Sequence, residues 1–259
     1  MHITGNTIFL TGGGSGIGRA LAEKLAALGN KVIISGRRQA LLDEVTAANP
    51  GIASIAFDIA DPAAIRDVAR TLVAEYPSLN VVINNAGIMR NENLIKLGPD
   101  VADAEATITT NLLGPIRLTA ALLPHFLAQP SATIMTVSSG LAFQPLAMTP
   151  AYSATKAAIH SWTQSLRYQL KDTAIQVIEL APPYVQTRLM GERQARDSYA
   201  MPLNEFIDEV IAILTNTPDV TEVLVERVKP QRFAEASGNG EAFFKTLNDR
   251  YFAARAAEF

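Results

Sequence analysis

The chain has 259 residues, of which 18 % are charged and 48 % apolar, with a net charge of −3 and no cysteine. This length fits one large α/β domain. The lack of cysteine excludes disulfides, thiolate-bound zinc, iron–sulfur clusters and thiol catalysis, and the slight negative charge argues against a nucleic-acid partner.

Short apolar runs alternate with helix-like segments along the chain. The runs that predict buried strands are 7–11, 31–35, 52–57, 79–83, 133–137 and 175–180. The helical pattern covers 19–28, 39–48, 61–75, 103–128, 151–171 and 203–214. Continuous apolar strands that alternate with helices predict a parallel sheet covered on both faces. We therefore expect a single-domain α/β fold, a doubly wound Rossmann-type parallel sheet of about seven strands.

The chain divides into a main domain and a short tail. We expect residues 1–228 to form the dinucleotide-binding and catalytic domain. Residues 229–259 form a C-terminal extension with an expected helix at 240–256, packed on the same domain. The sequence does not show how this helix docks.

A stretch without Asp, Glu, Lys or Arg runs from residue 118 to residue 155. A membrane span needs about 20 mostly apolar residues. Four prolines and many hydroxyl side chains interrupt this stretch, so we expect no membrane insertion. The first residues lack the basic and apolar segments of a signal peptide. We therefore expect a cytoplasmic protein.

A glycine-rich turn joins the first strand to the first helix. It has the spacing T-G-x-x-x-G-x-G and runs from Thr11 to Gly18. Glycine permits a positive φ and a close approach of the backbone to a pyrophosphate, and a helix N-terminus offers free N–H groups to an anion. The alternative is a merely flexible turn, but the place between strand and helix favours dinucleotide binding. The expected cofactor contacts in this turn are Gly12, Gly14, Ser15, Gly16, Ile17 and Gly18.

The residues after the second strand bear on the choice between NAD and NADP. An acidic residue there would bind the ribose 2′-hydroxyl of NAD, whereas an arginine accommodates the 2′-phosphate of NADP. The sequence has Arg37 and Arg38 at this place, and the next acidic residue is Asp43. Because a guanidinium suits a phosphate, we expect NADP, with NAD less favoured. Two solvated arginines at a helix start are the alternative.

Tyr152 and Lys156 lie four residues apart in a predicted helix, so they share one helix face. Lys156 is also the first charged residue after Arg117. An ammonium about 4.5 Å from a phenol, at an effective dielectric of ~20, lowers the pKa of the phenol by roughly 2.7 units. Such a pKa is closer to the range in which an acid/base catalyst works best. We expect Tyr152 to act as general acid/base.

Together these motifs resemble those of the short-chain dehydrogenase/reductase family. The resemblance covers at least residues 6–190, and residues 4–7, 111–119 and 179–183 are similar to the DltE-like subgroup. It implies that the catalytic residues are Asn111, Ser139, Tyr152 and Lys156. Besides Arg37, Arg38 and the glycine turn, it implies cofactor contacts from Asp58, Ile59, Asn85, Ala86, Gly87, Tyr152, Lys156, Pro182, Val185 and Thr187.

The resemblance also implies a role for each catalytic residue. Ser139 would position the substrate oxygen, and Lys156 would bind the nicotinamide ribose. Asn111 would hold a backbone irregularity and a water that links Lys156 to solvent. Ser139 is preferred to Ser138 because it has the family's thirteen-residue offset from Tyr152.

Two positions depart from the family pattern. Pro183 stands where many relatives have glycine, and Ser15 stands where many NADP-dependent relatives have a basic residue. The three histidines lack a metal-binding spacing, so we predict no metal site. Four further side chains fit a substrate wall or core packing equally well: Leu141, Phe143, Met148 and Tyr184.

The sequence thus predicts an oxidoreductase that transfers a hydride between NADP(H) and a small-molecule carbonyl or secondary alcohol. The alternatives are a non-catalytic NADP-binding sensor or scaffold protein and a D-alanyl esterase. The resemblance further implies a homodimer or homotetramer, formed through the helices at 103–128 and 151–171.

Overall fold

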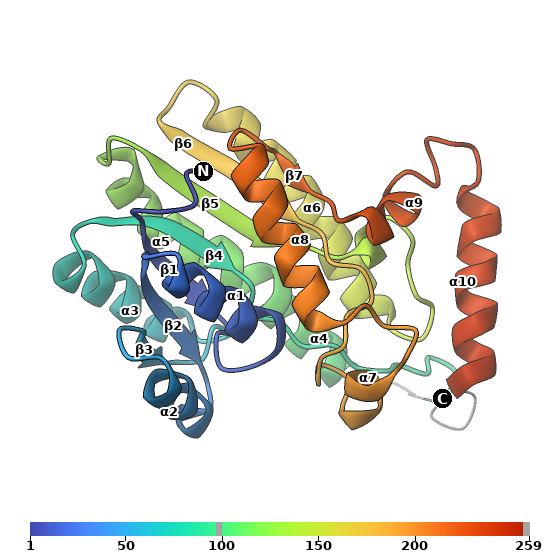
Figure 1. Ribbon diagram of the computed structural model, residues 1–259. Coiled ribbons are helices and arrows are strands. Elements are labelled where there is room, and N and C mark those ends of the chain that lie inside the picture. Colours follow the sequence, from blue (N-terminus) through green and yellow to red (C-terminus); the bar gives the residue numbers. More distant parts are fainter. Residues whose placement is uncertain (97–99, 256–259) are drawn as a thin grey trace.

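The computed structural model describes residues 1–96 and 100–255 (Figure 1). In these ranges seven strands form one sheet in the order β3-β2-β1-β4-β5-β6-β7, and all neighbouring strands are parallel. The predicted doubly wound α/β fold is therefore confirmed. The strands are β1 (Thr7–Thr11), β2 (Lys31–Gly36), β3 (Ala53–Ala56), β4 (Leu79–Asn84), β5 (Ala132–Val137), β6 (Ile175–Leu180) and β7 (Glu222–Val223).

Helices cover both faces of the sheet (Figure 1). One face carries α1 (Gly16–Ala27), α2 (Gln39–Ala48) and α8 (Leu203–Asn216). The other carries α3 (Pro62–Glu75), α5 (Gly114–Leu127) and α6 (Pro150–Gln169).

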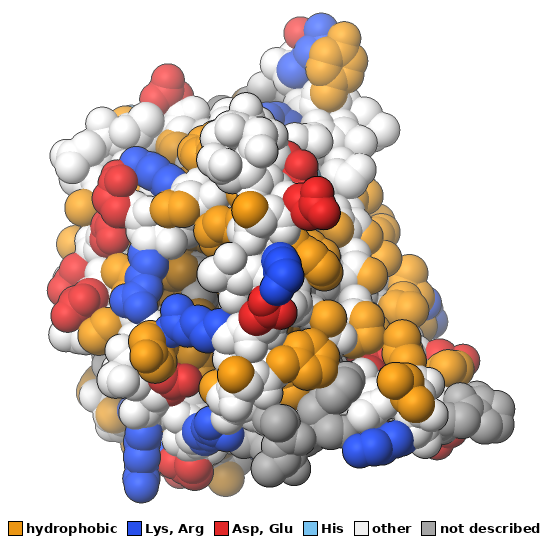
Figure 2. Space-filling model, turned by 90° about the vertical axis from the view of Figure 1, so that its right-hand side faces the viewer, with side chains coloured by type: hydrophobic (Ala, Val, Ile, Leu, Met, Phe, Trp, Pro, Cys, Tyr) orange, Lys and Arg blue, Asp and Glu red, His pale blue; other side chains and the backbone are white. Residues whose placement is uncertain are grey.

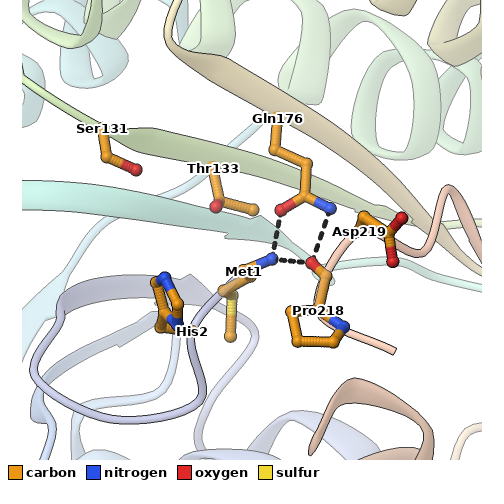
Figure 3. Close-up of a pocket in the computed structure, with 7 residues that line it drawn as sticks. All are labelled: Met1, His2, Ser131, Thr133, Gln176, Pro218 and Asp219. Atoms are coloured by element: carbon orange, nitrogen blue, oxygen red, sulfur yellow. Dashed lines mark hydrogen bonds between the residues drawn. The ribbon is translucent and has the colours of Figure 1, made fainter. Parts of the chain in front are cut away.

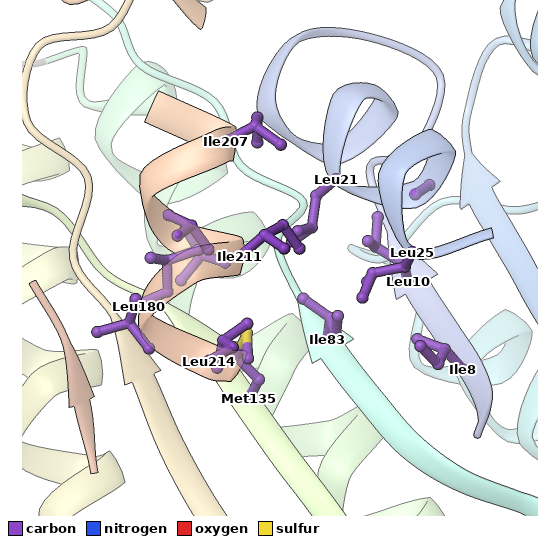
Figure 4. Close-up of a cluster of buried hydrophobic side chains, with 14 of the residues drawn as sticks. Ile8, Leu10, Leu21, Leu25, Ile83, Met135, Leu180, Ile207, Ile211 and Leu214 are labelled. Carbon is purple, nitrogen blue, oxygen red and sulfur yellow. The ribbon is translucent and has the colours of Figure 1, made fainter. Parts of the chain in front are cut away.

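The central strands are mostly apolar because both of their faces are buried. In β1, Ile8 and Leu10 pack toward α1 and α8, whereas Phe9 belongs to the core on the opposite face. Figure 4 shows the first of these cores, in which Leu21 of α1 and Ile211 of α8 meet above the strands.

The segment predicted as one helix from 103 to 128 is interrupted. It consists of α4 (Ala102–Ile108), a π-helical turn (Thr109–Leu113) and α5, which follow one another directly. The backbone N–H of Gly114 donates to the carbonyl of Thr109, five residues back. Pro115 explains why the α-helix cannot continue, since it has no N–H to donate to the carbonyl of Asn111.

The C-terminal extension contains α9 (Lys229–Arg232) and α10 (Gly240–Arg255). Residue 256 of the predicted helix and the rest of the tail to 259 lie outside the described residues. Asn248 Oδ1 accepts a hydrogen bond from the Ala147 backbone at 2.7 Å, and Arg255 Nη2 donates to Tyr184 Oη at 2.6 Å. These contacts attach α10 to the loops after β5 and β6. Figure 2 shows this side of the molecule, where hydrophobic and charged side chains are interspersed.

A pocket at the amino-terminal ends of β5 and β6 contains the first residue of the chain (Figure 3). The Met1 ammonium donates hydrogen bonds to Gln176 Oε1 and to the Pro218 carbonyl. Doubly wound sheets bind ligands at the opposite, carboxyl ends of their strands. We therefore do not assign this pocket to the functional site. Across residues 1–96 and 100–255, no helix combines the length and apolar character needed to span a membrane.

Candidate active site

The sheet order reverses between β1 and β4, and the loops after these two strands are joined there. Thr11 Oγ1 accepts hydrogen bonds from the backbone N–H groups of Asn85 (3.0 Å) and Ala86 (3.1 Å). Asn85 Nδ2 donates in return to the Thr11 carbonyl at 2.9 Å. This reversal is where doubly wound sheets bind their ligands. Thr11 is missing from the predicted site residues, although its first position in the glycine motif is a signal that points to it.

The glycine turn packs closely against itself and against the loop after β4. Gly12 and Gly16 have φ of +73° and +55°, in the left-handed region that favours glycine. A Cβ on Gly12 would lie 2.9 Å from Ala86 Cα, and one on Gly18 would lie 2.3 Å from the Gly12 carbonyl oxygen. Ser15 is the N-cap residue of α1, and in the described part of the chain its side chain makes no capping hydrogen bond. The first turn of α1 contains no acidic residue. This cradle, with N–H groups at the start of α1, fits a pyrophosphate.

Two other residues of this turn contact the helix layer. A Cβ on Gly14 would lie 3.2 Å from Leu41 Cβ in α2. Ile17 packs against the core between the sheet, α1 and α8. Both therefore hold the turn against its neighbours, in addition to any ligand contact.

The side chains that follow β2 and β3 meet at the same edge of the sheet. Arg37 Nη1 lies 3.7 Å from Asp58 Oδ2, and both side chains are partly exposed. Asp58 Oδ1 accepts a hydrogen bond from the Ala60 N–H at 2.9 Å. Arg38 is exposed at the N-cap of α2. Ile59 is instead buried, where its carbonyl oxygen would lie 2.9 Å from a Cβ on Gly114.

Tyr152 and Lys156 lie in the first half of α6, and both are buried. Lys156 Nζ donates a hydrogen bond to the Val137 carbonyl at 2.7 Å and lies 5.5 Å from the centre of the Tyr152 ring. Ser139, two residues after β5, is hydrogen-bonded to the Tyr152 side chain. Ser138 is also buried, and its Oγ lies 3.5 Å from the Leu180 carbonyl in β6. The structure therefore brings Ser139, Tyr152 and Lys156 together and leaves Ser138 apart.

Asn111 lies at the centre of the π-helical turn and binds two neighbouring segments. Its Oδ1 accepts a hydrogen bond from the Ile88 N–H at 2.9 Å, and its Nδ2 donates to the Ile88 carbonyl at 2.8 Å. Nδ2 also lies 3.3 Å from Thr155 Oγ1, one residue before Lys156. A Cβ on Gly87 would lie 3.3 Å from Asn111 Oδ1. Asn111 thus connects the loop after β4 to the helix that carries Tyr152 and Lys156.

Burial dominates the electrostatics of this group. It raises the pKa of Tyr152 to about 12, while the hydrogen bond with Ser139 acts in the opposite direction. It lowers the pKa of Lys156 to about 8, while the charge of Glu179 acts to raise it. The predicted lowering of the Tyr152 pKa by Lys156 is therefore wrong for this geometry. Desolvation of the phenolate outweighs the ammonium, which is hydrogen-bonded to the Val137 carbonyl.

The segment after β6 reaches back to the glycine turn. The Pro182 carbonyl accepts a hydrogen bond from the Gly140 N–H at 2.8 Å, which ties this segment to the Ser139 loop. A Cβ on Gly16 would lie 3.5 Å from Thr187 Cβ. Val185 is buried between these two points.

A buried glutamine of α7 (Glu192–Arg196) holds this segment in place. Gln194 Nε2 donates hydrogen bonds to the Val185 carbonyl at 2.9 Å and to Thr187 Oγ1 at 3.1 Å. Gln194 Oε1 accepts one from the Met190 N–H at 3.0 Å. Gln194 is not among the residues predicted for the site, because no pattern around it distinguishes it from a surface glutamine.

Four side chains fit either a substrate wall or core packing by sequence, and the structure gives them different surroundings. Met148 is fully buried, and the Phe143 ring lies edge-on against His160 with 4.9 Å between the ring centres. Tyr184 Oη donates to Asp197 Oδ2 at 3.1 Å. Leu141 is half-buried and lines a shallow apolar groove.

The chain is similar to proteins of one family over most of its length. The sequence model for short chain dehydrogenases matches residues 6–198. The uncharacterized oxidoreductase DltE of Bacillus subtilis is 43 % identical over 201 residues, which cover 78 % of this chain and 79 % of that protein.

Two solved structures share the fold. A 3-ketoacyl-(acyl-carrier-protein) reductase from Brucella melitensis, complexed with NADH, has a TM-score of 0.76 at 25 % identity and covers 85 % of this chain and 96 % of its own. A short chain dehydrogenase from Burkholderia cenocepacia, in complex with NADP, has a TM-score of 0.79 at 24 % identity, with 95 % and 99 % covered. On the family match and these similarities, the chain belongs to the short-chain dehydrogenase/reductase family, as an NAD(P)-dependent oxidoreductase similar to DltE.

Proposed function

We propose that this protein transfers a hydride between NADP(H) and a carbonyl or secondary alcohol substrate, with Tyr152 as general acid/base. The observation that carries this proposal is a buried group of three side chains beyond the carboxyl end of β5. Ser139 follows that strand, and Tyr152 and Lys156 lie on α6. A phenol held beside a hydroxyl and an ammonium is suited to exchange a proton with a substrate oxygen.

The preference for NADP rests on Arg37. Its guanidinium is 59 % exposed at the end of β2, so a ligand can reach it, and its pairing with Asp58 is long at 3.7 Å. A planar guanidinium binds phosphate through two parallel hydrogen bonds. Arg38 is the second candidate, and its side chain is also exposed. The glycine cradle and Thr187 are assigned to the pyrophosphate and nicotinamide ends of the same cofactor.

The chain's own residues would control the proton. A bound nicotinamide cofactor supplies or accepts the hydride. In carbonyl reduction, Tyr152 Oη donates its proton to the substrate oxygen, which the Ser139 hydroxyl holds in position. The Lys156 ammonium stabilises the phenolate that remains. Because the pKa of Tyr152 is raised to about 12, its phenol is protonated at neutral pH and ready to act as an acid.

Asn111 is assigned a positioning role. Its amide connects Ile88 to α6 beside Thr155, which fixes the helix that carries both Tyr152 and Lys156. Pro115 has no N–H to donate to the Asn111 backbone carbonyl, and we assign this carbonyl to the water that would link Lys156 to solvent.

We further propose a cytoplasmic homodimer or homotetramer, formed through the α4–α5 segment and α6. Large apolar side chains on these helices support this proposal, because Ile108, Leu127 and Tyr168 are exposed by 42 %, 52 % and 72 %. Light scattering coupled to size-exclusion chromatography measures the assembly directly, and a monomer at micromolar concentration would contradict it.

The test of the function is a pair of kinetic measurements. The wild-type protein is titrated with NADPH and NADH and assayed on a panel of aldehydes and ketones. Tyr152→Phe should reduce kcat by about 10²–10⁴-fold while cofactor affinity is retained. Tyr76→Phe, which removes a hydroxyl at the end of α3, is the matched control and should retain full activity. Wild-type rates in Tyr152→Phe would refute the mechanism.

A further inference from the structure

A partly buried cluster of polar and charged side chains lies beneath α6, and its member His160 is one helical turn after Lys156. Glu179 in β6 is fully buried, and its Oε2 lies 2.7 Å from His160 Nδ1. Glu222 in β7 is bound by the Arg232 guanidinium through two hydrogen bonds, of 2.9 Å and 3.1 Å. None of these residues was predicted from the sequence to have a function.

The Glu179 side chain extends from β6 toward the face of α6 that carries Lys156. Lys156, His160 and Thr163 are spaced by four and three residues and form one stripe along the helix. Thr163 Oγ1 lies 2.7 Å from Thr136 Oγ1 in β5, so this stripe faces the sheet. Glu179 is the register partner of Thr136, and paired residues of parallel strands point to the same side. The Glu179 carboxylate therefore lies in the layer between sheet and helix that also holds the Lys156 ammonium.

One oxygen of this carboxylate has no nearby hydrogen-bond donor. In the described part of the chain, Glu179 Oε1 is buried and has no partner. A buried carboxylate is unfavourable unless positive charge lies close to it. Such an unsatisfied group in the interior calls for a functional explanation.

The basic side chains around Glu179 come from two elements. On α6, Arg167 Nε and Nη2 donate to the backbone carbonyls of β6 and of the segment before β7, and His160 binds Glu179 directly. On α9, Arg232 also attracts Glu179, but its hydrogen bonds go to Glu222. Lys156 is the remaining ammonium on the stripe, and Glu179 acts to raise its pKa.

The same cluster has the spacing of a metal site, because ligand atoms of His160, Glu179 and Glu222 lie within 4.8 Å of one another. The guanidinium of Arg232 already binds both oxygens of Glu222. It also lies 4.6 Å from the centre of the Phe143 ring, whose edge contacts His160. Arg232 therefore neutralises Glu222 in place of an ion and fastens α9 to the sheet.

We propose that Glu179 is a positioning residue for the proposed reaction, whose buried carboxylate keeps Lys156 in the ammonium form beside Tyr152 while His160 holds that carboxylate in place. This inference rests on the proposed function of Lys156. Burial alone favours a neutral lysine, and an ammonium is what stabilises the Tyr152 phenolate. Glu179 supplies the opposing charge from β6, without touching substrate or cofactor.

The sign of the expected pH effect follows from the lysine. The ammonium is lost as the pH rises through the pKa of Lys156, which is about 8. Removal of the Glu179 charge lowers that pKa further, so activity should be lost at lower pH. Two unit charges roughly 6–12 Å apart, at an effective dielectric of ~20, shift one another's pKa by about one to two units. At about pH 5, at least one unit below the lowered pKa, Lys156 is protonated in both proteins and their kcat/KM values should differ little.

The experiment compares Glu179→Gln with Glu222→Gln. Both remove one carboxylate charge from the same cluster, and the two residues are register partners in β6 and β7. The Glu222 charge is neutralised by Arg232, whereas the Glu179 charge acts on the pKa of Lys156. We measure kcat/KM for carbonyl reduction from roughly pH 5 to pH 10, together with cofactor affinity and thermal unfolding. Glu179→Gln should shift the alkaline limb of the profile to lower pH, and Glu222→Gln should leave that limb in place.

Two outcomes would overturn the proposal. One is an equal loss of kcat/KM at every pH in Glu179→Gln, which indicates a structural role, and the other is the same shift in both variants. If Glu179→Gln does not fold, His160→Gln replaces it and should give a smaller shift in the same direction. The absence of that smaller shift also overturns the proposal.

A second readout separates this proposal from the proposed function. The protein is labelled with ¹³C at lysine Cε, and the Lys156 resonance, assigned by its loss in Lys156→Arg, is titrated by NMR. A lower pKa of Lys156 in Glu179→Gln supports the proposal even if no carbonyl substrate is found. An unchanged pKa refutes it even if Tyr152→Phe is inactive as expected.

Discussion

Arg37 and Asp58 approach each other across the carboxyl ends of β2 and β3, with Arg37 Nη1 3.7 Å from Asp58 Oδ2. The pair joins the residue proposed to bind the 2′-phosphate to a second expected cofactor contact. Exposed pairs of this kind contribute little to stability, because water screens both charges. The guanidinium is therefore available for a phosphate at little cost.

Arg37→Ala should weaken NADPH binding much more than NADH binding. The guanidinium makes charge-assisted hydrogen bonds of roughly 1.5–3 kcal/mol to a phosphate, which corresponds to about a 10–100-fold rise in the KM for NADPH. The KM for NADH, which lacks the 2′-phosphate, should change less than about threefold. Steady-state kinetics with both cofactors measure the effect.

Arg38→Ala is the control for this prediction, since Arg38 is exposed at the adjacent position. It should have the smaller effect on NADPH. A larger loss in Arg38→Ala would transfer the phosphate contact to Arg38. A wild-type preference for NADH of tenfold or more would contradict the assignment of NADP altogether.

The pH dependence of carbonyl reduction should follow Lys156 rather than Tyr152. The phenol, with its pKa raised to about 12, is protonated throughout the usual range, so it imposes no limit below that pH. The ammonium, with its pKa lowered to about 8, is fully present below this value and is lost above it. The kcat/KM for reduction should therefore be flat below about pH 8 and fall tenfold per unit above it. A rate that rises between pH 8 and pH 10 would contradict this assignment.

The fold could be predicted because its strands are buried on both faces. Residues such as Ile8, Phe9 and Leu10 are all buried, so each strand appears in the sequence as a continuous apolar run. The last strand, Glu222–Val223, has only two residues and leaves no such run. The π-helical turn was also not predicted as such, because hydrophobic periodicity does not register a single extra residue, although Pro115 is a visible cause.

The site could be predicted where glycine or spacing leaves a pattern. Gly12, Gly16 and Gly18 are required by φ or by close backbone contacts, and Tyr152 and Lys156 are fixed by helical spacing. The residues that were missed act through tertiary contacts. Glu179 lies in a mostly apolar strand, and its partner His160 lies nineteen positions away in the chain. Local sequence does not show which polar side chains will meet in the interior.

Asn111→Ala should lower activity and stability together. Loss of the amide leaves the N–H and carbonyl of Ile88 without partners, at a cost of about 1–3 kcal/mol in the free energy of unfolding. Release of α6 beside Thr155 should also lower kcat by about 10–100-fold, since small displacements of reacting groups slow a reaction strongly. Thr109→Ala, in the same π-helical turn, is the control and should change both quantities little. Chemical denaturation and steady-state kinetics measure them, and full activity in Asn111→Ala would refute the positioning role.

Gly18→Ala should be the most damaging change in the glycine turn. Alanine favours a helix over glycine by about 1 kcal/mol, so helix propensity alone predicts a gain in stability. The added Cβ, however, would lie 2.3 Å from the Gly12 carbonyl oxygen and 2.4 Å from Asn85 Nδ2. Because the first of these atoms is backbone, the turn must move, and the junction between β1 and the loop after β4 must move with it. Cofactor affinity should fall at least tenfold, with a lower melting temperature.

In Gly36→Ala, the new Cβ meets only Leu42 Cδ2 at 3.7 Å, so this control should retain both properties. Wild-type affinity in Gly18→Ala, measured by fluorescence titration with NADPH, would show that the cradle does not depend on this contact.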